Sequence, residues 1–392
     1  MTESLNLDIS RIPKELQMII ELIKVDKSNN LENSLLFQNI DWDKFIDLAM
    51  HHRVYSKLYL KIKQYENFTA PKSIIDLLSN QYQKNTFQML HLSAEMEYIS
   101  KLLFEENINH LYVKGPVIAK DLYGDISLRT SKDLDILVEI NQLEKTKALL
   151  LKEGYIEEYQ GSILNDWKWR IHHVSFNHPV KKVNLEIHWR LHPAPMIEPP
   201  FTELWDRRRK SELTKFPVYY LGKEDLFLFL MVHGARHGWF RLRWLVDIRQ
   251  ITSQELDWKK LNLMIEKYNY QKIVGQGLIL ANKIFGTKIN DEAILFYNKK
   301  SSKLLAEKAL FFLENKVEFD NGESSQIAKK YNKRYLFSIR NIKQRIILGL
   351  RVMHPSFSDY ETFPLPKQVH FLYFLLRPFL VFWRNFKNRE LI

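Results

Sequence analysis

The 392-residue sequence predicts an α+β protein, in which a small mixed sheet with flanking helices lies between helical N- and C-terminal regions. Residues 12–110 repeat apolar side chains at helical spacing, and residues 223–313 do the same. Short apolar runs typical of strands gather between 111 and 190. At 45% hydrophobic residues the chain has enough apolar material for folded domains with cores. The expected divisions are a helical N-terminal region at 1–100, a sheet domain at 101–215 and a helical C-terminal domain at 216–392.

The first hundred residues are predicted to be helical. Apolar residues at helical spacing indicate helices at Pro13–Val25, Trp42–Met50 and Val54–Tyr65. A longer run begins after Pro71 and continues to about Glu106 without any Pro or Gly. We expect this run to be one long helix that packs against the sheet domain.

The middle of the chain mixes strand and helix patterns. A helix at Gln142–Glu153 is expected to end at Gly154, because glycine is favoured just past a helix. A turn is expected near His178-Pro179, and several prolines between Pro193 and Pro200 indicate an extended segment that leaves the domain. The predicted strands are Leu111–Val113, Leu134–Ile140, Val174–Asn177 and Val183–Arg190.

Helical patterns return after Lys223. The expected helices are Glu224–His233, Leu242–Ile251, Leu261–Tyr268, Ile273–Phe285 and Asp291–Leu313. The last apolar segment, Pro366–Arg384, is interrupted by Arg377-Pro378 and is too short for a transmembrane helix. We favour a helix that closes the C-terminal core. The alternative is an amphipathic helix within 366–389 that makes peripheral contact with a membrane.

The charge balance favours an anionic partner. The net charge is +12, which suits a nucleotide, a nucleic acid or a membrane surface. The excess is spread over clusters at 207–210, 299–300 and 329–340, and no run of interleaved aromatics resembles a single-strand binding platform. Nucleic acid is therefore an alternative that we do not favour.

The residues that are missing also carry information. The chain has no cysteine, which excludes disulfides and cysteine-based zinc sites and fits a reducing cytoplasm. The N-terminal residues lack the basic and apolar regions of a secretory signal. We expect a cytoplasmic protein, with attachment to the inner face of the membrane as the alternative noted above.

Asp133 and Asp135 are the first candidates for chemistry. Side chains alternate across a strand, so residues two apart project from the same face. Two adjacent carboxylates repel, and burying them is costly unless a cation lies between them. Mg²⁺ commonly uses one or two carboxylates together with substrate phosphates. An exposed polar face is the alternative explanation for this pattern.

A corner that precedes the acidic strand favours phosphate chemistry. Lys114 offers a point charge for a phosphate, and Gly115 allows the backbone to approach a ligand closely. Pro116 suits the first position of a helix. A helix that begins there directs its N-terminal amides toward an anion.

These motifs together resemble a known superfamily. Lys114-Gly115, Arg129 and Asp133–Val138 are similar to the core of the polymerase-β-like nucleotidyltransferases, and Asn184–Trp189 resembles their third-carboxylate strand. A bacterial nucleotidyltransferase family is most similar, because it shares these motifs and a later His-Gly-x-x-His segment, here His233–His237. The resemblance runs from about Asp41 to about Arg377.

The resemblance implies a metal-dependent catalytic centre. Asp133, Asp135 and Glu186 are expected to be the catalytic residues and the ligands of Mg²⁺ or Mn²⁺, with two ions bound. Two metals can stabilise the attacking and leaving oxygens of a phosphoryl centre. Glu186 would also take the proton of the acceptor.

The same comparison implies which residues contact the nucleotide. Lys114 and the amides after Gly115 are expected to hold the triphosphate. Arg129 and Ser131 are weaker candidates for phosphate contacts. The donor would be a nucleoside triphosphate, most simply ATP, and the acceptor a small molecule, a peptide or a glycan precursor.

Several histidines are candidates for acceptor contacts. His188 follows Glu186 by two positions and is expected to share its strand face. His233 and His237 are four apart on a predicted helix and therefore share a face, with Arg241 nearby. Their spacing resembles part of a zinc motif, but the glutamate of that motif is missing, so we favour substrate contact. His172-His173 is expected to line the cleft as well.

Departures from the wider superfamily keep other functions open. Its usual Gly-Gly or Gly-Ser corner is Lys114-Gly115-Pro116 here, and eighteen positions separate Gly115 from Asp133, which is longer than usual. Glu186 replaces the commoner Asp. The alternatives are glycosyl or phosphoryl transfer at the same site, or a non-catalytic basic binding module.

Overall fold

The computed structural model describes residues 7–24, 38–65, 70–158, 161–317 and 325–390. The N-terminal helices form as the periodicity predicts, with Val25 at the end of the first lying outside the described residues. The side chain of Asp41 caps the second helix at Lys44 N. The helices are α1 (Lys14–Lys24), α2 (Trp42–His51), α3 (Tyr55–Gln64) and α4 (Lys72–Glu105).

The described strands form one seven-stranded sheet in the order β3-β4-β5-β2-β1-β7-β6. The strands are β1 (His110–Tyr112), β2 (Asp133–Val138), β3 (Ile156–Glu157), β4 (His173–His178), β5 (Val183–His188), β6 (Arg209–Ser211) and β7 (Val218–Tyr220). The two acidic strands, β2 and β5, are parallel neighbours near the centre, whereas β1 and β4 pair with them in antiparallel orientation.

The sheet is larger than the sequence indicated. Strands β3, β6 and β7 were not predicted, and they extend the sheet at both edges. β3 has two residues, and β6 reads Arg-Lys-Ser, so neither carries the apolar alternation that identifies a strand. Their backbones pair because neighbouring strands present free hydrogen-bonding edges to them.

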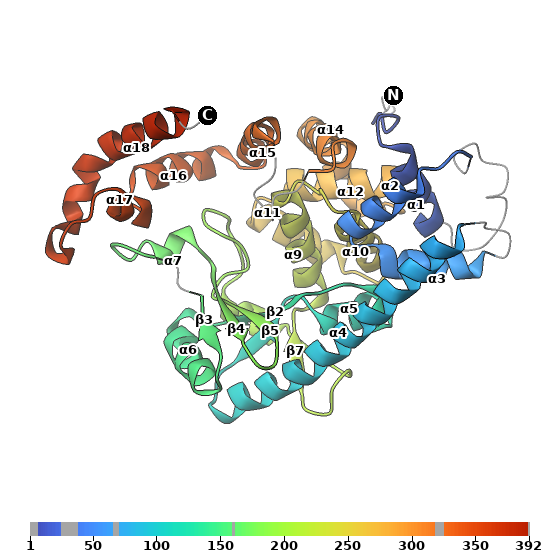
Figure 1. The fold of residues 1–392 in the computed structure, drawn as a ribbon, viewed down its shortest axis with the longest axis horizontal. Helices are drawn as coiled ribbons and strands as arrows, with labels where there is room; N and C mark the ends of the chain where they lie inside the picture. Colours follow the sequence, from blue (N-terminus) through green and yellow to red (C-terminus); the bar gives the residue numbers. More distant parts are fainter. Residues whose placement is uncertain (1–6, 25–37, 66–69, 159–160, 318–324, 391–392) are drawn as a thin grey trace.

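Short helices connect the strands and cover the sheet, and the long α4 contacts both β2 and β7. The helix predicted at Gln142–Glu153 is α6, and Gly154 follows it with φ of +85°. The connecting helices are α5 (Pro116–Tyr123), η2 (Ile126–Leu128), η3 (Ile140–Gln142), α6 (Leu143–Lys152), α7 (Trp167–Arg170) and α8 (Phe201–Asp206). Figure 1 shows α4 running along one side of the sheet.

The chain after Lys223 is helical, as expected, but the helix predicted at Asp291–Leu313 is wrong as a single element. It begins with a 3₁₀ turn that continues into a short α-helix, and a new helix starts after Lys299, whose backbone is extended with ψ of 129°. The elements are α9 (Lys223–Arg236), α10 (Leu242–Thr252), α11 (Trp258–Lys267), α12 (Gln271–Phe285), η4 (Asp291–Ala293), α13 (Ile294–Tyr297), α14 (Lys300–Glu314), α15 (Gln326–Ser338), α16 (Ile342–Met353), α17 (Phe357–Thr362), η5 (Lys367–Leu372) and α18 (Tyr373–Glu390).

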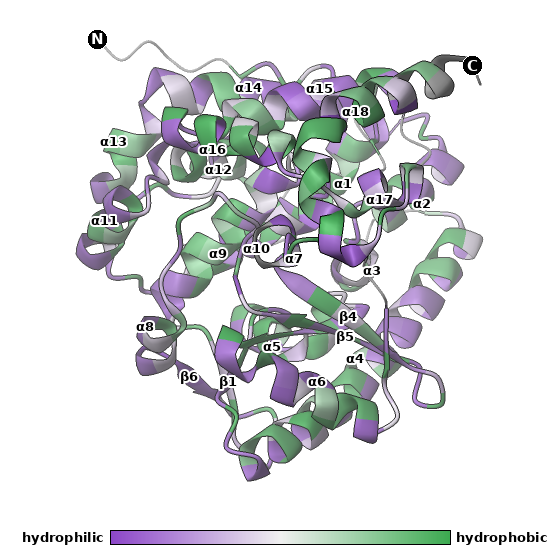
Figure 2. Ribbon diagram, turned by 90° about the vertical axis from the view of Figure 1, so that its left-hand side faces the viewer, coloured by the Kyte–Doolittle hydropathy of each residue, from purple (hydrophilic) through white to green (hydrophobic). Residues whose placement is uncertain are grey.

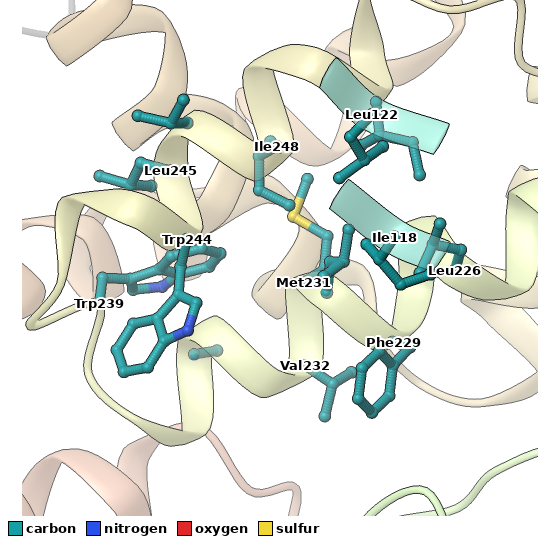
Figure 3. Close-up of a cluster of buried hydrophobic side chains, with 14 of the residues drawn as sticks. Ile118, Leu122, Leu226, Phe229, Met231, Val232, Trp239, Trp244, Leu245 and Ile248 are labelled. Atoms are coloured by element: carbon teal, nitrogen blue, oxygen red, sulfur yellow. The ribbon is translucent and has the colours of Figure 1, made fainter. Parts of the chain in front are cut away.

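A buried apolar interface joins the sheet domain to the C-terminal helices. Figure 3 shows Ile118 and Leu122 of α5 facing side chains of α9 and α10, among them Met231 and Ile248. All four side chains are buried. Because α5 begins at the Lys-Gly corner, this packing fixes α9 and α10 relative to that corner of the sheet domain.

The last helices do not close the C-terminal core, so the favoured prediction for Pro366–Arg384 was wrong. Among the described residues, the main buried core ends at Ile339. Figure 1 shows α16, α17 and α18 together at one end of the molecule, and Figure 2 places α14, α15 and α18 at the end opposite α4 and α6. Within the described part of the chain, no helix combines the length and the apolar character that crossing a membrane requires.

Candidate active site

The register of two parallel strands brings the expected carboxylates together. Asp135 on β2 pairs directly with Glu186 on β5, and Asp133 pairs with Asn184. Asp135 is fully buried, whereas Asp133 and Glu186 are partly accessible. Three acidic side chains therefore meet at one end of the central strands, as the alternation of strand side chains predicted.

His188 bridges two of these carboxylates. Its Nε2 lies 3.1 Å from Asp135 Oδ1 and 3.2 Å from Glu186 Oε2. Burial disfavours the imidazolium, but hydrogen bonds to the two carboxylates outweigh it and raise the pKa of His188. The prediction that His188 and Glu186 share a strand face is confirmed, and Trp189, the next residue, is buried.

Lys114 contributes a cation from the corner after β1. Its Nζ lies 2.5 Å from Asp135 Oδ1. Burial opposes the charge of the ammonium, yet Asp135, Asp133 and Glu186 together raise the pKa of Lys114. Gly115 has φ of +90°, where L side chains are disfavoured, and α5 begins at the next residue. The expected glycine corner and helix start are therefore both present.

The two aspartates have opposite electrostatic environments. Burial favours the neutral acid at both positions. At Asp133 the charge of Asp135 adds to burial, and the pKa is raised. At Asp135 the charge of Lys114 and the hydrogen bond from His188 outweigh burial, and the pKa is lowered. Asp135 is thus the firmly ionised member of the pair.

A cavity of about 300 Å³ lies beside the cluster, and Lys114, Asp133, Glu186 and His188 line it. Its walls come from β2 and β5, from the Lys114 corner, and from α9 and α10 across the buried interface described above. Basic side chains dominate the lining, and they are Arg53, Lys114, Arg129, Arg236, Arg241 and Arg243. A concave site with this concentration of positive charge suits a polyphosphate.

Histidines form a second group on the cavity wall. His173 pairs with His188 across β4 and β5, and the ring of His172 lies 5.3 Å from that of His188. His233 and His237 come from α9 and its C-terminal end, with ring centroids 4.6 Å apart. All of them line the cavity. Burial lowers the pKa of His237 to about 3 and that of His173 to about 4, so both rings are neutral at pH 7.

Comparison with known proteins places this architecture in a family. A family model described as an uncharacterised nucleotidyltransferase matches residues 38–286, well over half of the chain. The chain belongs to this nucleotidyltransferase family. The matched region includes the acidic strands, the Lys114 corner and the α9 histidines, and it ends at Gly286, just after α12.

Two further comparisons add little to the nucleotidyltransferase assignment. A crystal structure of an antigenic nucleotidyltransferase-like protein from Paracoccidioides brasiliensis is 13% identical, with a TM-score of 0.30. The match covers 52% of this chain and 96% of that one. No curated protein matches the sequence.

Arg129, expected to contact phosphate, is engaged in a buried ion pair. Its Nε lies 3.1 Å from Asp247 Oδ1 on α10, and Tyr123 donates to the same carboxylate at 2.7 Å. Arg243, four residues before Asp247 on α10, donates to Thr130 instead. Arg129 lines the nucleotidyltransferase cavity and also joins the sheet domain to α10.

Ser131 and Arg241 also lie where a ligand would reach them. The Ser131 hydroxyl donates to the backbone carbonyl of Asp133 at 3.1 Å, which fixes the start of β2. Arg241 is the residue before α10, and its guanidinium lies 5.1 Å from the ring of Phe240. Both residues line the cavity.

Three cavity arginines were missed by sequence reasoning. Arg53 lies between α2 and α3, with φ of +54°, and it reaches the cavity from the N-terminal region. Arg236 lies within the His233–His237 segment, so its position next to two candidate histidines could have indicated that it lines the cavity. Arg243 is fully buried, and burial together with Arg129 and Arg53 lowers its pKa to about 9.

The acidic cluster fits a divalent metal ion. Ligand atoms of Asp135, Glu186 and His188 lie within 4.8 Å of one another. Among the described residues, Asp135 Oδ2 is buried with no hydrogen-bond partner, which leaves a carboxylate oxygen available as a ligand. Asp133, the third expected ligand, lines the same cavity outside this group.

Proposed function

We propose that this member of the nucleotidyltransferase family transfers a nucleoside monophosphate from a nucleoside triphosphate to a hydroxyl or phosphate of an acceptor. ATP is the simplest donor, and Mg²⁺ or Mn²⁺ is the metal. One observation carries the proposal: carboxylates on two adjacent strands face a wall of basic side chains across a single cavity. Phosphoryl chemistry needs that combination, because positioning and charge neutralisation supply most of its catalysis.

The basic wall would bind the polyphosphate of the donor. Lys114 and the backbone amides at the start of α5 lie at the acidic end of the cavity, next to Asp135. Arg241 and Arg243 approach from α10. Opposite walls would thus hold the triphosphate with its α-phosphorus near the carboxylates, which is the alignment an in-line displacement requires.

The reaction balances with the groups present. An acceptor oxygen forms a bond to the α-phosphorus, and the bond from that phosphorus to the bridging oxygen of pyrophosphate breaks. Glu186 would take the proton of an acceptor hydroxyl, and His188 would hold the Glu186 carboxylate in place through its 3.2 Å contact. Pyrophosphate leaves toward the basic wall.

A divalent metal ion, when bound, would neutralise phosphate charge beside the acceptor oxygen. Asp135 and Glu186 would hold it, together with Asp133 at the open side of the cavity. Lys114 holds Oδ1 of Asp135, and Oδ2 has no hydrogen-bond partner among the described residues, so the metal ion would bind Oδ2 and share the carboxylate with the ammonium.

A neighbouring cavity offers room for the acceptor. It has a volume of about 570 Å³ and shares Arg53, Ser131 and Arg241 with the catalytic cavity. Lys84 and Lys132 add positive charge to its lining. An acceptor with a phosphate or carboxylate group, such as a phosphorylated small molecule or a glycan precursor, suits these side chains.

Calorimetric titration tests the proposal. ATP, GTP, CTP and UTP would be titrated with Mg²⁺ into the native chain and into the Asp133→Asn/Asp135→Asn double variant. Metal-dependent binding of a triphosphate that the double variant loses is the expected result, followed by release of pyrophosphate when an acceptor is supplied. Absence of binding by all four nucleotides would refute the triphosphate donor, and a sugar adduct by product mass would establish glycosyl transfer instead.

A further inference from the structure

The C-terminal arm, defined as residues 325–390 with helices α15 to α18, carries most of the net positive charge. It contains thirteen Lys and Arg residues against three Asp and Glu, a net charge of +10. The whole chain has a net charge of +12. The rest of the molecule is therefore nearly neutral, and the basic character noted from composition belongs to this arm.

Helix α18 presents an apolar face to solvent. The exposed residues recur at helical spacing, three or four positions apart, and so form one continuous stripe. They are Phe371 in η5 and Phe374, Leu375, Phe379, Phe382, Trp383 and Phe386 in α18. Phe379 is 73% exposed and Leu375 is 72% exposed. Single apolar residues are common on protein surfaces, but a continuous exposed stripe marks an interaction site.

An ion-pair clamp fixes this orientation. Asp359 of α17 is buried and accepts from Arg377 and from Arg384, whose Nη2 lies 2.7 Å from its Oδ1. Both arginines lie on α18, away from the apolar stripe. The polar side of the helix is therefore turned inward toward α17, and the apolar side must face outward.

Helix α16 repeats the pattern beside it. Its exposed apolar residues are Ile342, Ile346, Ile347, Leu350, Val352 and Met353. The two helices are joined, since Arg377 donates to the Val352 carbonyl at 2.6 Å and the ring of His354 contacts that of Phe374. Two apolar helical faces thus occur in one cationic unit.

The arm is anchored to the sheet domain near the cavity. Arg351 of α16 donates to the carbonyls of Arg170 and Ala194, and Arg170 donates to the Pro355 carbonyl at 3.0 Å. Arg170 lies two residues before His172 of the cavity wall. Whatever covers the arm is consequently held at a fixed position relative to the catalytic cavity.

We propose that the C-terminal arm docks the protein on an anionic phospholipid membrane. Aromatic and aliphatic side chains beside basic ones are the composition of helices that lie at a membrane surface, and each basic residue adds attraction to anionic lipid. A second copy of the chain is disfavoured, because two arms of charge +10 repel each other. Nucleic acid would leave the aliphatic face of α16 exposed to water.

Vesicle cosedimentation tests the docking. The native chain is expected to bind vesicles that contain phosphatidylglycerol at least about tenfold more tightly than phosphatidylcholine vesicles, with binding weakened by salt. The Leu375→Glu/Phe379→Glu variant should lose at least about tenfold in affinity, because it places two charges on the apolar stripe.

A matched control separates this face from general surface apolarity. Leu263→Glu/Leu295→Glu alters side chains that are 71% and 72% exposed on α11 and α13, and it should bind vesicles like the native chain. Equal losses in both variants, or no vesicle binding by the native chain, would overturn the proposal. So would a native dimer that Leu375→Glu/Phe379→Glu converts to monomer, or RNA binding that this variant abolishes without vesicle binding by the native chain.

Fluorescence provides a second readout that does not depend on a charged substitution. Trp383 is 67% exposed on the apolar stripe, so lipids brominated on their acyl chains should quench its emission. Trp383→Phe keeps the apolar character and should retain vesicle binding while losing this quenching. Identical quenching in the native chain and in Trp383→Phe would contradict insertion of the α18 face.

Discussion

The ammonium of Lys114 lies 2.5 Å from the Asp135 carboxylate at the centre of the acidic cluster. Lys114 comes from the corner after β1 and Asp135 from the middle of β2, and both side chains are shielded from solvent. The protein thus supplies its own cation at the point where three carboxylates would otherwise repel. Metal ion and lysine must share this carboxylate, and their competition can be measured.

Replacing Lys114 should separate metal binding from nucleotide binding. Lys114→Met removes the competing cation, so Mn²⁺ affinity without nucleotide should rise by about tenfold. Affinity for ATP should fall by about tenfold, because a phosphate contact is lost. Mn²⁺ titration followed by electron paramagnetic resonance, with calorimetry for ATP, measures both. Lys120→Met is the matched control, since Lys120 is exposed on α5, the helix that follows the Lys114 corner, and bonds only to the Gly124 carbonyl among the described contacts.

Asp133→Asn and Asp135→Asn should differ in their free energy of unfolding, although both variants should lose turnover. Asp135→Asn leaves Lys114 and His188 without their buried partner and should cost about 3–5 kcal/mol in the free energy of unfolding. Asp133→Asn removes a carboxylate whose pKa burial already raises, so its unfolding free energy should be unchanged or slightly higher. Urea unfolding at pH 7 checks the difference, and equal destabilisation would show that the opposite environments do not hold.

The Arg129–Asp247 ion pair should stabilise the fold, whether or not Arg129 also contacts phosphate. Arg129→Met and Asp247→Leu should each cost about 3–5 kcal/mol, because each leaves a buried charge unpaired. The double variant should recover most of that loss. If Arg129 also contacts phosphate, ATP affinity stays reduced in the stable double variant. A thermal-unfolding double-mutant cycle with calorimetry distinguishes the two roles, and additive losses would argue against coupling.

His110, which does not line the candidate active site, should make the free energy of unfolding depend on pH. It is buried on β1 against Ser100 of α4, and burial lowers its pKa to about 4, below the unfolded value. A depressed folded pKa means that the stability it contributes is full above about pH 6.5 and falls as pH drops toward 4. The native chain should therefore lose roughly 2–3 kcal/mol more than His110→Gln between pH 7 and pH 4.5. Urea unfolding at several pH values measures this, and parallel curves would contradict it.

Local sequence patterns predicted the acidic strands well. The alternation of Asp133 and Asp135 fixed their common face, and the glycine after Lys114 indicated the corner with φ of +90°. Both depend on neighbours within a few residues. Strands β3, β6 and β7 were missed because each has only two or three residues, too few to show an alternating pattern, and their pairing depends on neighbouring strands rather than on their own sequence.

The basic wall of the cavity was only partly predictable. Arg53 and Arg243 come from segments almost two hundred residues apart, and they line one cavity because the Arg243 backbone N–H donates to the His52 carbonyl and α10 packs on α5. The charge pair of Arg129 with Asp247 also spans distant elements, although Arg243 lies four residues before Asp247 on the same helix. Local periodicity cannot select among partners that lie on other elements.

The sequence by itself determined the fold class, the long α4, the acidic strands and the family of the chain, because hydrophobic periodicity and short motifs act over a few residues. The tertiary structure decided three further features: the buried Lys114–Asp135 contact, the basic cavity wall, and the outward apolar face of α18. An amphipathic helix has the same pattern whether its apolar side meets a core or solvent. In α18, the buried Asp359 turns the polar side inward, and that contact exists only in the folded chain.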